Sequence, residues 1–126
     1  MAKKIISTEK APSAIGPYSQ AVAYGNMVFT SGQIAIDPTT GELIMDSVEA
    51  ETHQVMKNLT AVLAEEGLDF SNVIKTSIFL KNMDDFARVN EVYASYFSAD
   101  YPARETVQVA RLPKDVNVEI SMIAGK

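Results

Sequence analysis

Hydrophobic residues recur with helical spacing in a segment that covers residues 47–66. At about 100° per residue, its mainly apolar positions fall on one stripe, and Gln54, Lys57 and Ala61 lie on the opposite side. The stripe consists of Val48, Thr52, Val55, Met56, Leu59, Val62 and Leu63. The pattern predicts one amphipathic helix over 47–66.

The ends of this helix and its one histidine are also predicted by the sequence. Asp46 followed by Glu49 indicates an acidic variant of the capping box, and Gly67 indicates the stop. His53 lies on the polar flank of the stripe, so we expect an exposed or half-exposed helix residue.

A second segment with helical spacing covers residues 84–97. Its apolar face consists of Phe86, Val89, Tyr93, Tyr96 and Phe97. Asn90 lies on the margin of that face, where a buried amide needs hydrogen-bond partners. From spacing alone, an amide that ties helix to sheet is favoured over a ligand contact.

Runs of β-branched and apolar residues, separated by turn residues, indicate six strands. The predicted strands are 4–7, 20–24, 27–36, 73–80, 105–110 and 117–124. Gly25-Asn26 indicates a tight hairpin, and the segment 38–41 indicates a turn. The order of elements predicts an α+β sandwich with both helices on one face of the sheet.

Strand 73–80 is apolar on both of its faces. Ile74, Ile78 and Leu80 alternate with Val73 and Phe79. Two helices cover only one face of a sheet, so we expect the other face to pack against further subunits of a homo-oligomer.

Length and composition narrow the classes of protein. The 126 residues, 47% hydrophobic, are enough for a single core, and we treat 1–126 as one domain. A net charge of −5 disfavours nucleic-acid binding, and the lack of cysteine removes thiolate chemistry and cysteine-ligated metals. With a single histidine we expect no metal site, and without an apolar leader or membrane span we expect a cytoplasmic protein.

Two strands carry polar residues that suggest chemistry. Alternation places Arg104 and Thr106 on one strand face and Glu105 on the other, and an arginine there can clamp a carboxylate with paired hydrogen bonds. A salt bridge with an acidic side chain is the competing interpretation. Glu119 shares a face with Ser121, where it either handles a proton or is simply exposed.

Two turns near the N-terminal half are further candidates. Ser31-Gly32 ends an apolar run and either lets a ligand approach the backbone closely or forms a bulge. Tyr18 follows Gly16-Pro17 in a rigid turn and either covers a pocket or packs on the surface.

Four segments together resemble the RidA family of reactive-intermediate deaminases, also called the YjgF or L-PSP family. The segments are IGPYSQA (15–21), VFTSGQIAIDPTTGEL (28–43), DDFARVNEVYASYF (84–97) and PARETVQVARLPKDVNVEI (102–120). The resemblance runs in order over nearly the whole chain. It implies a chorismate-mutase-like fold assembled as a homotrimer with a central barrel-like core and clefts between subunits.

The resemblance also implies an activity without cofactor or metal. Family members hydrolyse 2-imino acids such as 2-aminoacrylate/2-iminopropanoate and 2-iminobutanoate to 2-keto acids and ammonia. By position, Arg104 matches the arginine that binds the substrate carboxylate, and Glu119 matches the glutamate that positions or activates water. Tyr18, Ser31, Gly32 and Asn90 match pocket positions that contact substrate or shape the cleft.

One departure from the family pattern concerns the residues after the arginine. Many deaminases of the family have Arg-Ser-Cys, whereas this chain has Arg104-Glu105-Thr106. The resemblance implies that residue 106 orients water chiefly through its backbone carbonyl, so we expect threonine to serve. A carboxylate at Glu105 is expected to weaken the clamp or shift the preferred imine. The alternative function is therefore a regulatory module that binds small carboxylates without catalysis.

Overall fold

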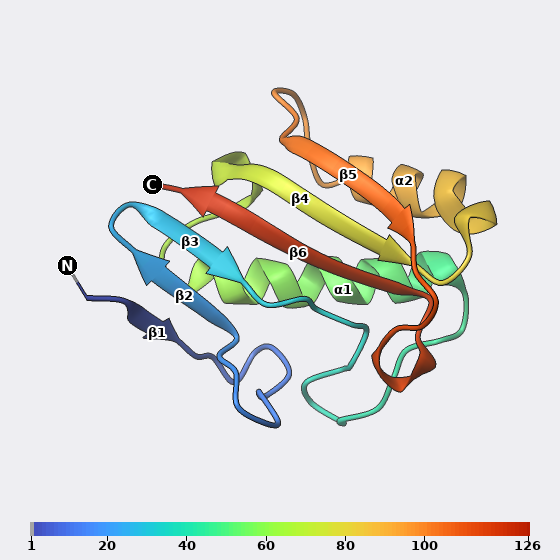
Figure 1. Cartoon of the computed structure of the whole chain (residues 1–126), viewed down its shortest axis with the longest axis horizontal. Helices are drawn as coiled ribbons and strands as arrows, with labels where there is room; N and C mark the ends of the chain where they lie inside the picture. The colour runs from blue at the N-terminus through green and yellow to red at the C-terminus, as the bar shows by residue number, and fades with distance from the viewer. Residues whose placement is uncertain (1) are drawn as a thin grey trace.

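The computed structural model describes residues 2–126 and has two layers, a six-stranded mixed β-sheet and two α-helices that lie together on one face of it (Figure 1). The strands are β1 (Lys4–Ile6), β2 (Ala21–Tyr24), β3 (Met27–Thr30), β4 (Val73–Leu80), β5 (Ala103–Gln108) and β6 (Val118–Gly125). The helices are α1 (Val48–Ala64) and α2 (Phe86–Ala94), and short 3-10 turns cover Phe70–Asn72, Met83–Asp85 and Pro113–Asp115. The predicted α+β fold with both helices on one face is confirmed.

The sheet order places the last strand near the middle. The order is β1-β2-β3-β6-β4-β5, in which all neighbours are antiparallel except β4 and β5. The parallel β4–β5 pair is connected through α2, as parallel neighbours require a crossover. β6 thus pairs on one side with β3 and on the other with β4.

The predicted stripe of α1 faces the sheet and forms the core with it. All seven stripe residues are buried, and they pack with alternate residues of β6, namely Val118, Ile120, Met122 and Ala124. His53 is exposed, as predicted. The predicted cap is wrong: Ser47, not Asp46, begins the helix, and its Oγ accepts a hydrogen bond from Ala50 N at 3.0 Å.

The second helix is shorter than the predicted 84–97. Residues 83–85 form a 3-10 turn, and the α-helix ends at Ala94. Tyr96 and Phe97 still pack against the core from the following turns, where their backbone N–H groups bond three residues back. Their apolar spacing therefore indicates that they are buried, and it does not indicate that the α-helix continues through them.

The predicted strand 27–36 is also too long, because β3 ends at Thr30. Phe29 pairs with Ile123, whereas Gln33 pairs with Ile120 in an isolated bridge. Four steps on one chain therefore oppose three on the other, which is a β-bulge at Ser31-Gly32. The bulge interpretation of these two residues is confirmed. β5 is also shifted by two residues from the predicted 105–110.

A second irregularity changes the faces predicted for β4. The register shifts between Val73 and Lys75, so Val73 is buried and Ile74 is half exposed, the reverse of the predicted alternation. From Thr76 onward the alternation holds, with Ile78 and Leu80 buried under the helices.

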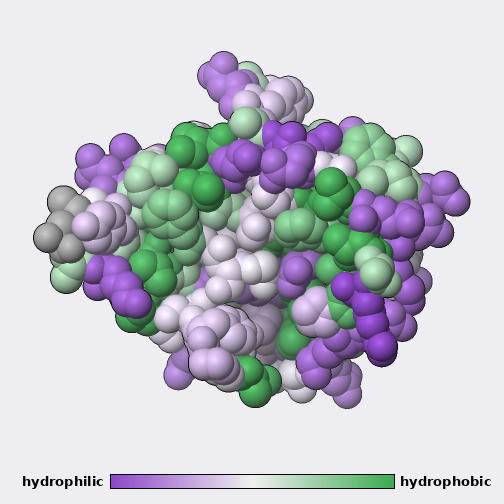
Figure 2. Space-filling view, in the orientation of Figure 1, coloured by the Kyte–Doolittle hydropathy of each residue, from purple (hydrophilic) through white to green (hydrophobic). Residues whose placement is uncertain are grey.

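The face of the sheet away from the helices is only partly apolar. Figure 2 looks onto this face and shows hydrophobic and polar side chains interspersed over it. Phe29 and Val107 are exposed there, and Phe79 and Ile123 are half-buried. The polar residues on the same face are Lys75, Ser77, Glu105, Glu119 and Ser121, as the strand register requires.

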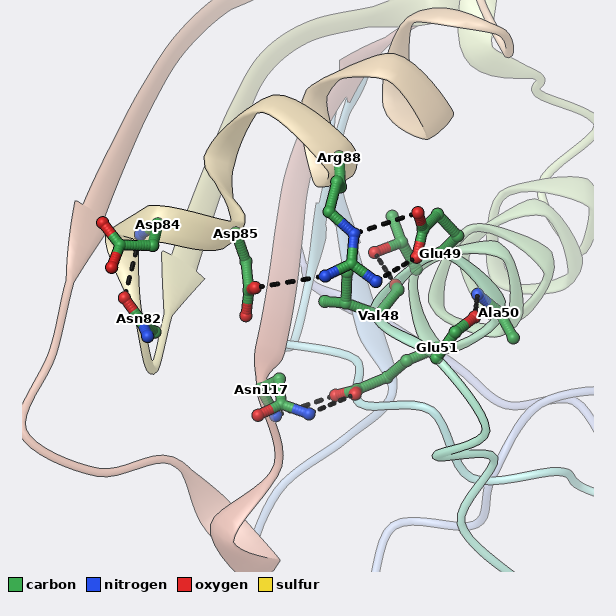
Figure 3. Close-up of polar contacts among 11 residues, drawn as sticks. Val48, Glu49, Ala50, Glu51, Asn82, Asp84, Asp85, Arg88 and Asn117 are labelled. Carbon is green, nitrogen blue, oxygen red and sulfur yellow. Dashed lines mark hydrogen bonds and ion pairs between the residues drawn. The ribbon is translucent and has the colours of Figure 1, made fainter.

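The helix layer is joined to the sheet by a buried carboxylate. Glu51 on α1 is 0% exposed, and it accepts hydrogen bonds from Asn117 N, Asn117 Nδ2 and Val118 N at 2.8, 2.8 and 3.1 Å. Figure 3 shows this contact beside the more exposed pair of Glu49 and Arg88, which joins α1 to α2. Glu51 therefore fixes the backbone at the beginning of β6.

We predict that Glu51→Gln destabilises the protein by about 3 kcal/mol, because the amide presents N–H groups to buried backbone donors. Glu49→Gln, on the same helix, is the matched control and should cost much less, since its partner is at the surface. Urea unfolding of both variants at one protein concentration measures the difference. Equal losses would contradict the role of Glu51.

Candidate functional site

A cleft of about 580 Å³ lies beside the bulge of Ser31-Gly32 and the beginning of β6. Its wall combines apolar and polar residues: Pro12, Ser13, Ile15, Tyr18, Ser31, Gly32, Gln33, Ile34, Ile36, Pro113, Lys114 and Glu119. Four of the predicted site residues, Tyr18, Ser31, Gly32 and Glu119, are therefore brought together.

Gly32 and Glu119 fit closely against each other. A Cβ atom built on Gly32 would lie 2.8 Å from Cδ and 2.9 Å from Oε2 of Glu119. Real Cβ atoms essentially never come so near, so the carboxylate occupies the space that any other residue at 32 would need. Because Gly32 has no side chain, the carboxylate of Glu119 can lie directly against its backbone.

The environment of Glu119 favours its protonated form more than water does. The side chain is half-buried, and burial raises the pKa of this carboxyl above the ordinary value of 4.5. Within residues 2–126 no cation or hydrogen-bond donor engages the carboxylate to offset that effect. Such a group can accept and return a proton closer to neutral pH than an ordinary glutamate.

Tyr18 and Ser31 are placed differently in this cleft. Tyr18 is 53% exposed and follows the turn at Gly16, with its ring at the cleft wall. Ser31 donates its hydroxyl proton to the carbonyl of Ser19 at 2.5 Å, so this hydroxyl offers a ligand only its lone pairs.

The other two predicted binding residues, Arg104 and Asn90, line a second pocket of about 480 Å³. This pocket is also lined by Tyr93, Ala94, Tyr101 and Pro102. Arg104 is an exposed residue, and its Nη1 donates to Asn90 Oδ1 at 2.7 Å. Asn90 thus ties α2 to β5, as the structural interpretation of its position predicts, and no acidic side chain within residues 2–126 forms an ion pair with Arg104.

The two groups of residues lie on opposite faces of the sheet. Arg104 pairs with Thr76 of β4, whose hydroxyl meets Tyr93 of α2, so Arg104 is on the helix side. Glu119 pairs with Phe79 and alternates with the buried Ile120, so Glu119 is on the uncovered side. A single chain therefore does not direct both groups at one small molecule.

The residues after Arg104 alternate as predicted. Glu105 lies on the uncovered face, where Lys75 Nζ is 3.0 Å from its carboxylate and Ser77 Oγ donates to it. The Ser77 hydrogen bond, followed by Lys75, lowers the pKa of Glu105 below 4.5. The hydroxyl of Thr106 is buried, and no residue from 2 to 126 hydrogen-bonds to it.

His53 lies outside both pockets. Its Nδ1 forms an exposed hydrogen bond of 2.7 Å with Tyr96 Oη. No group of three or more His, Asp or Glu side chains within residues 2–126 is arranged to hold a metal ion.

Comparison with known proteins decides the family. The family model for endoribonuclease L-PSP matches residues 8–126. The chain belongs to the L-PSP family. The 2-iminobutanoate/2-iminopropanoate deaminase of Mus musculus is 49% identical over 122 residues, which are 97% of this chain and 90% of that protein.

Solved structures of the L-PSP family share the fold described above. The YjgF gene product of E. coli has a TM-score of 0.94 and 48% identity, and TdcF of E. coli with bound serine has a TM-score of 0.93 and 48% identity. In each case 98% of both chains is covered. The resemblance stated from the sequence is confirmed at the level of family and fold.

Some residues around the pockets stand out only in the structure. Lys114 lines the larger cleft, and both Lys114 and Asp115 have positive φ, which non-glycine residues rarely adopt.

No helix among residues 2–126 has the length and apolar character needed to cross a membrane.

We predict that Glu119 titrates above 4.5 and that Gly32→Ala moves its pKa back toward that value, because the new methyl group displaces the carboxylate from its half-buried place. Gly125→Ala is the matched control, since its Cβ would meet only Met27 Sδ at an ordinary 3.7 Å. Carboxyl ¹³C NMR titration measures both. An unperturbed Glu119 in the unmodified chain would refute the prediction.

Proposed function

We propose that this chain hydrolyses 2-imino acids, namely 2-aminoacrylate/2-iminopropanoate and 2-iminobutanoate, to 2-keto acids and ammonia. The observation that carries the proposal is Glu119, a half-buried carboxyl at the wall of a large cleft that pairs with no cation among residues 2–126. Membership of a family that includes the mouse deaminase supports the same reaction.

In the proposed reaction Arg104 binds the substrate carboxylate. Arg104 is an exposed residue, Asn90 engages only its Nη1, and among residues 2–126 no acidic side chain forms an ion pair with it. A planar guanidinium matches a carboxylate with two parallel hydrogen bonds. This contact orients the imine carbon relative to Glu119.

The iminium carbon is already electrophilic, so the hydrolysis needs a positioned water and a proton carrier. As water adds to this carbon, Glu119 takes one of its protons, and a carbinolamine forms. Glu119 then returns the proton to the amino nitrogen, the C–N bond breaks to release ammonia, and the ammonia takes up the remaining hydroxyl proton as the ketone forms. The iminium and one water are thus converted to a 2-keto acid and ammonium without another reactant.

Thr106 and Glu105 have secondary places in this proposal. The backbone carbonyl of Thr106 is assigned to orienting the water, as the resemblance implies, and its side chain is not required. The carboxylate of Glu105 is neutralised by Lys75 on the opposite face, so the proposal needs no compensation for it near Arg104.

We further propose that the working form is a homotrimer. Because Arg104 with Asn90 and Glu119 with Tyr18 lie on opposite faces of one sheet, a complete site requires a second copy to bring the two groups together. The partly apolar uncovered face, with exposed Phe29 and Val107, supports such packing.

We predict that Arg104→Ala lowers kcat/KM about a hundredfold, or about 3 kcal/mol, through loss of a charged hydrogen-bonded pair. A serine or threonine dehydratase supplies the imine, and release of the keto acid is followed with the unmodified protein, the variant and no addition. Near-normal turnover by the variant would exclude Arg104 as the clamp.

The same assay distinguishes a binding module from an enzyme. TdcF holds a bound serine, which favours small carboxylate ligands as a second candidate function. If the unmodified protein binds 2-oxobutanoate by calorimetry but does not accelerate hydrolysis, the binding module replaces the deaminase.

In an active protein, we predict that kcat in this assay falls as the pH decreases through the raised pKa of Glu119, because the base becomes protonated. Glu119→Gln should lower kcat at all pH values.

The shared site predicts complementation between inactive variants. Arg104→Ala and Glu119→Gln should each be nearly inactive, but a refolded 1:1 mixture should recover about one quarter of the normal activity, because that fraction of interfaces combines both intact residues. The measurement compares mixtures with each variant refolded alone, and sedimentation reports their mass. No recovery in trimers of normal mass would place both residues in one chain's site or exclude one of them.

A further inference from the structure

We infer that Phe86 and Tyr93 are positioning residues for Arg104, and that α2 holds the guanidinium in the orientation that receives a carboxylate. This inference rests on the proposed function for the identity of the ligand. Together with Asn90, the two aromatic residues occupy positions i, i+4 and i+7 of one helix, a spacing that places all three on one face. We call these three residues the arginine cradle.

Each residue of the arginine cradle contacts the guanidinium. Its central carbon lies 5.6 Å from the centroid of the Phe86 ring and 5.2 Å from that of Tyr93. These distances are within the range in which a cation is attracted to an aromatic face. Asn90 Oδ1 receives the hydrogen bond from Nη1 at 2.7 Å.

The arginine cradle is itself fixed to the sheet and to α1. Tyr93 is buried and donates its hydroxyl proton to Thr76 Oγ1 at 2.9 Å, and Thr76 is the residue that pairs with Arg104 across β4 and β5. On another side of α2, Arg88 binds Glu49 of α1 through Nε and Nη2 (Figure 3). The rings are therefore set before any ligand arrives.

The consequence for Arg104 concerns which donors remain for a ligand. Aromatic rings contact the flat guanidinium, and Nη1 is engaged by an amide rather than by an acid. Within residues 2–126 no hydrogen bond engages Nε or Nη2. An edge of the group is thus available to a planar carboxylate, and the charge is not neutralised in advance.

No residue of the arginine cradle changes its charge near neutral pH. Desolvation raises the pKa of the Tyr93 phenol above 10.0, despite the opposing effects of Thr76 and Arg104. Phe86 and Asn90 do not titrate. Binding of the carboxylate should therefore lack a pH dependence that originates in this face of α2.

The test replaces each ring and measures the dissociation constant of 2-oxobutanoate by calorimetry. Phe86→Leu and Tyr93→Leu should each weaken binding about twofold to fivefold, and should raise KM for the imine by a similar factor with kcat within about twofold of normal. Tyr93→Phe keeps the ring but loses the hydrogen bond to Thr76, so it should weaken binding less than Tyr93→Leu does. The matched control is Phe70→Leu, because Phe70 is also partly buried against the core but contacts Tyr96 and Phe97 instead.

A second readout does not depend on catalysis or on ligand. The side-chain protons of Arg104 should show ring-current displacement in NMR spectra, assigned by their loss in Arg104→Lys, and Phe86→Leu and Tyr93→Leu should each reduce that displacement. Normal spectra with unreduced displacement in both leucine variants would overturn the inference. Equal weakening of binding in Phe70→Leu would also overturn it, since the effect would then be general loosening.

The two readouts separate this inference from the proposed function. If the protein binds 2-oxobutanoate with the expected ring dependence but hydrolyses no imine, the deaminase proposal fails and the arginine cradle stands. If the protein is an active deaminase whose KM is unchanged in both leucine variants, the arginine cradle fails and the deaminase proposal stands.

Discussion

The carboxylate of Glu51 is the contact on which the arrangement of both pockets depends. It is buried on α1 and accepts three hydrogen bonds from the backbone and side chain at the beginning of β6. β6 carries Glu119 and pairs with β4, and β4 in turn fixes the register of β5, which carries Arg104. Without this carboxylate, the N–H donors at the beginning of β6 would be buried without hydrogen-bond partners. Because that loss costs free energy, Glu51 helps to maintain one register through the sheet.

The register of the sheet decides on which face each site residue lies. The alternation of a strand assigns each side chain to a face, and it assigns the arginine and the glutamate to different faces. The chemistry proposed for the chain therefore depends on symmetry: two incomplete surfaces become one site only when copies meet. In this view oligomerisation is part of the catalytic geometry and not only a means of covering apolar area.

Local periodicity predicted most of the fold, and it failed where tertiary contacts decided the outcome. The stripe of α1 and the alternation of β6 were right because burial on one face determines both patterns. The bulge at Ser31-Gly32 was one of two interpretations that its glycine allowed, whereas the irregularity at Val73 had no local signal, because it arises from the register of a partner strand. Glu51 was missed although its position, three residues after Val48 and four before Val55, places a charge at the edge of the apolar stripe. For the site, residue types and resemblance identified the candidates, but their distribution over two faces required the order of the strands.

The close fit of Gly32 and Glu119 limits the routes by which this sequence can change. A side chain at position 32 needs the volume that the glutamate carboxyl occupies, so the two cannot be present together in their current places. Shortening residue 119 first opens room for a later replacement at 32, whereas the reverse order passes through a crowded intermediate. Once a methyl group has settled at 32, restoring glutamate at 119 no longer restores the original geometry. Once Glu119 and then Gly32 have been replaced, reverting either position alone therefore does not restore the original site.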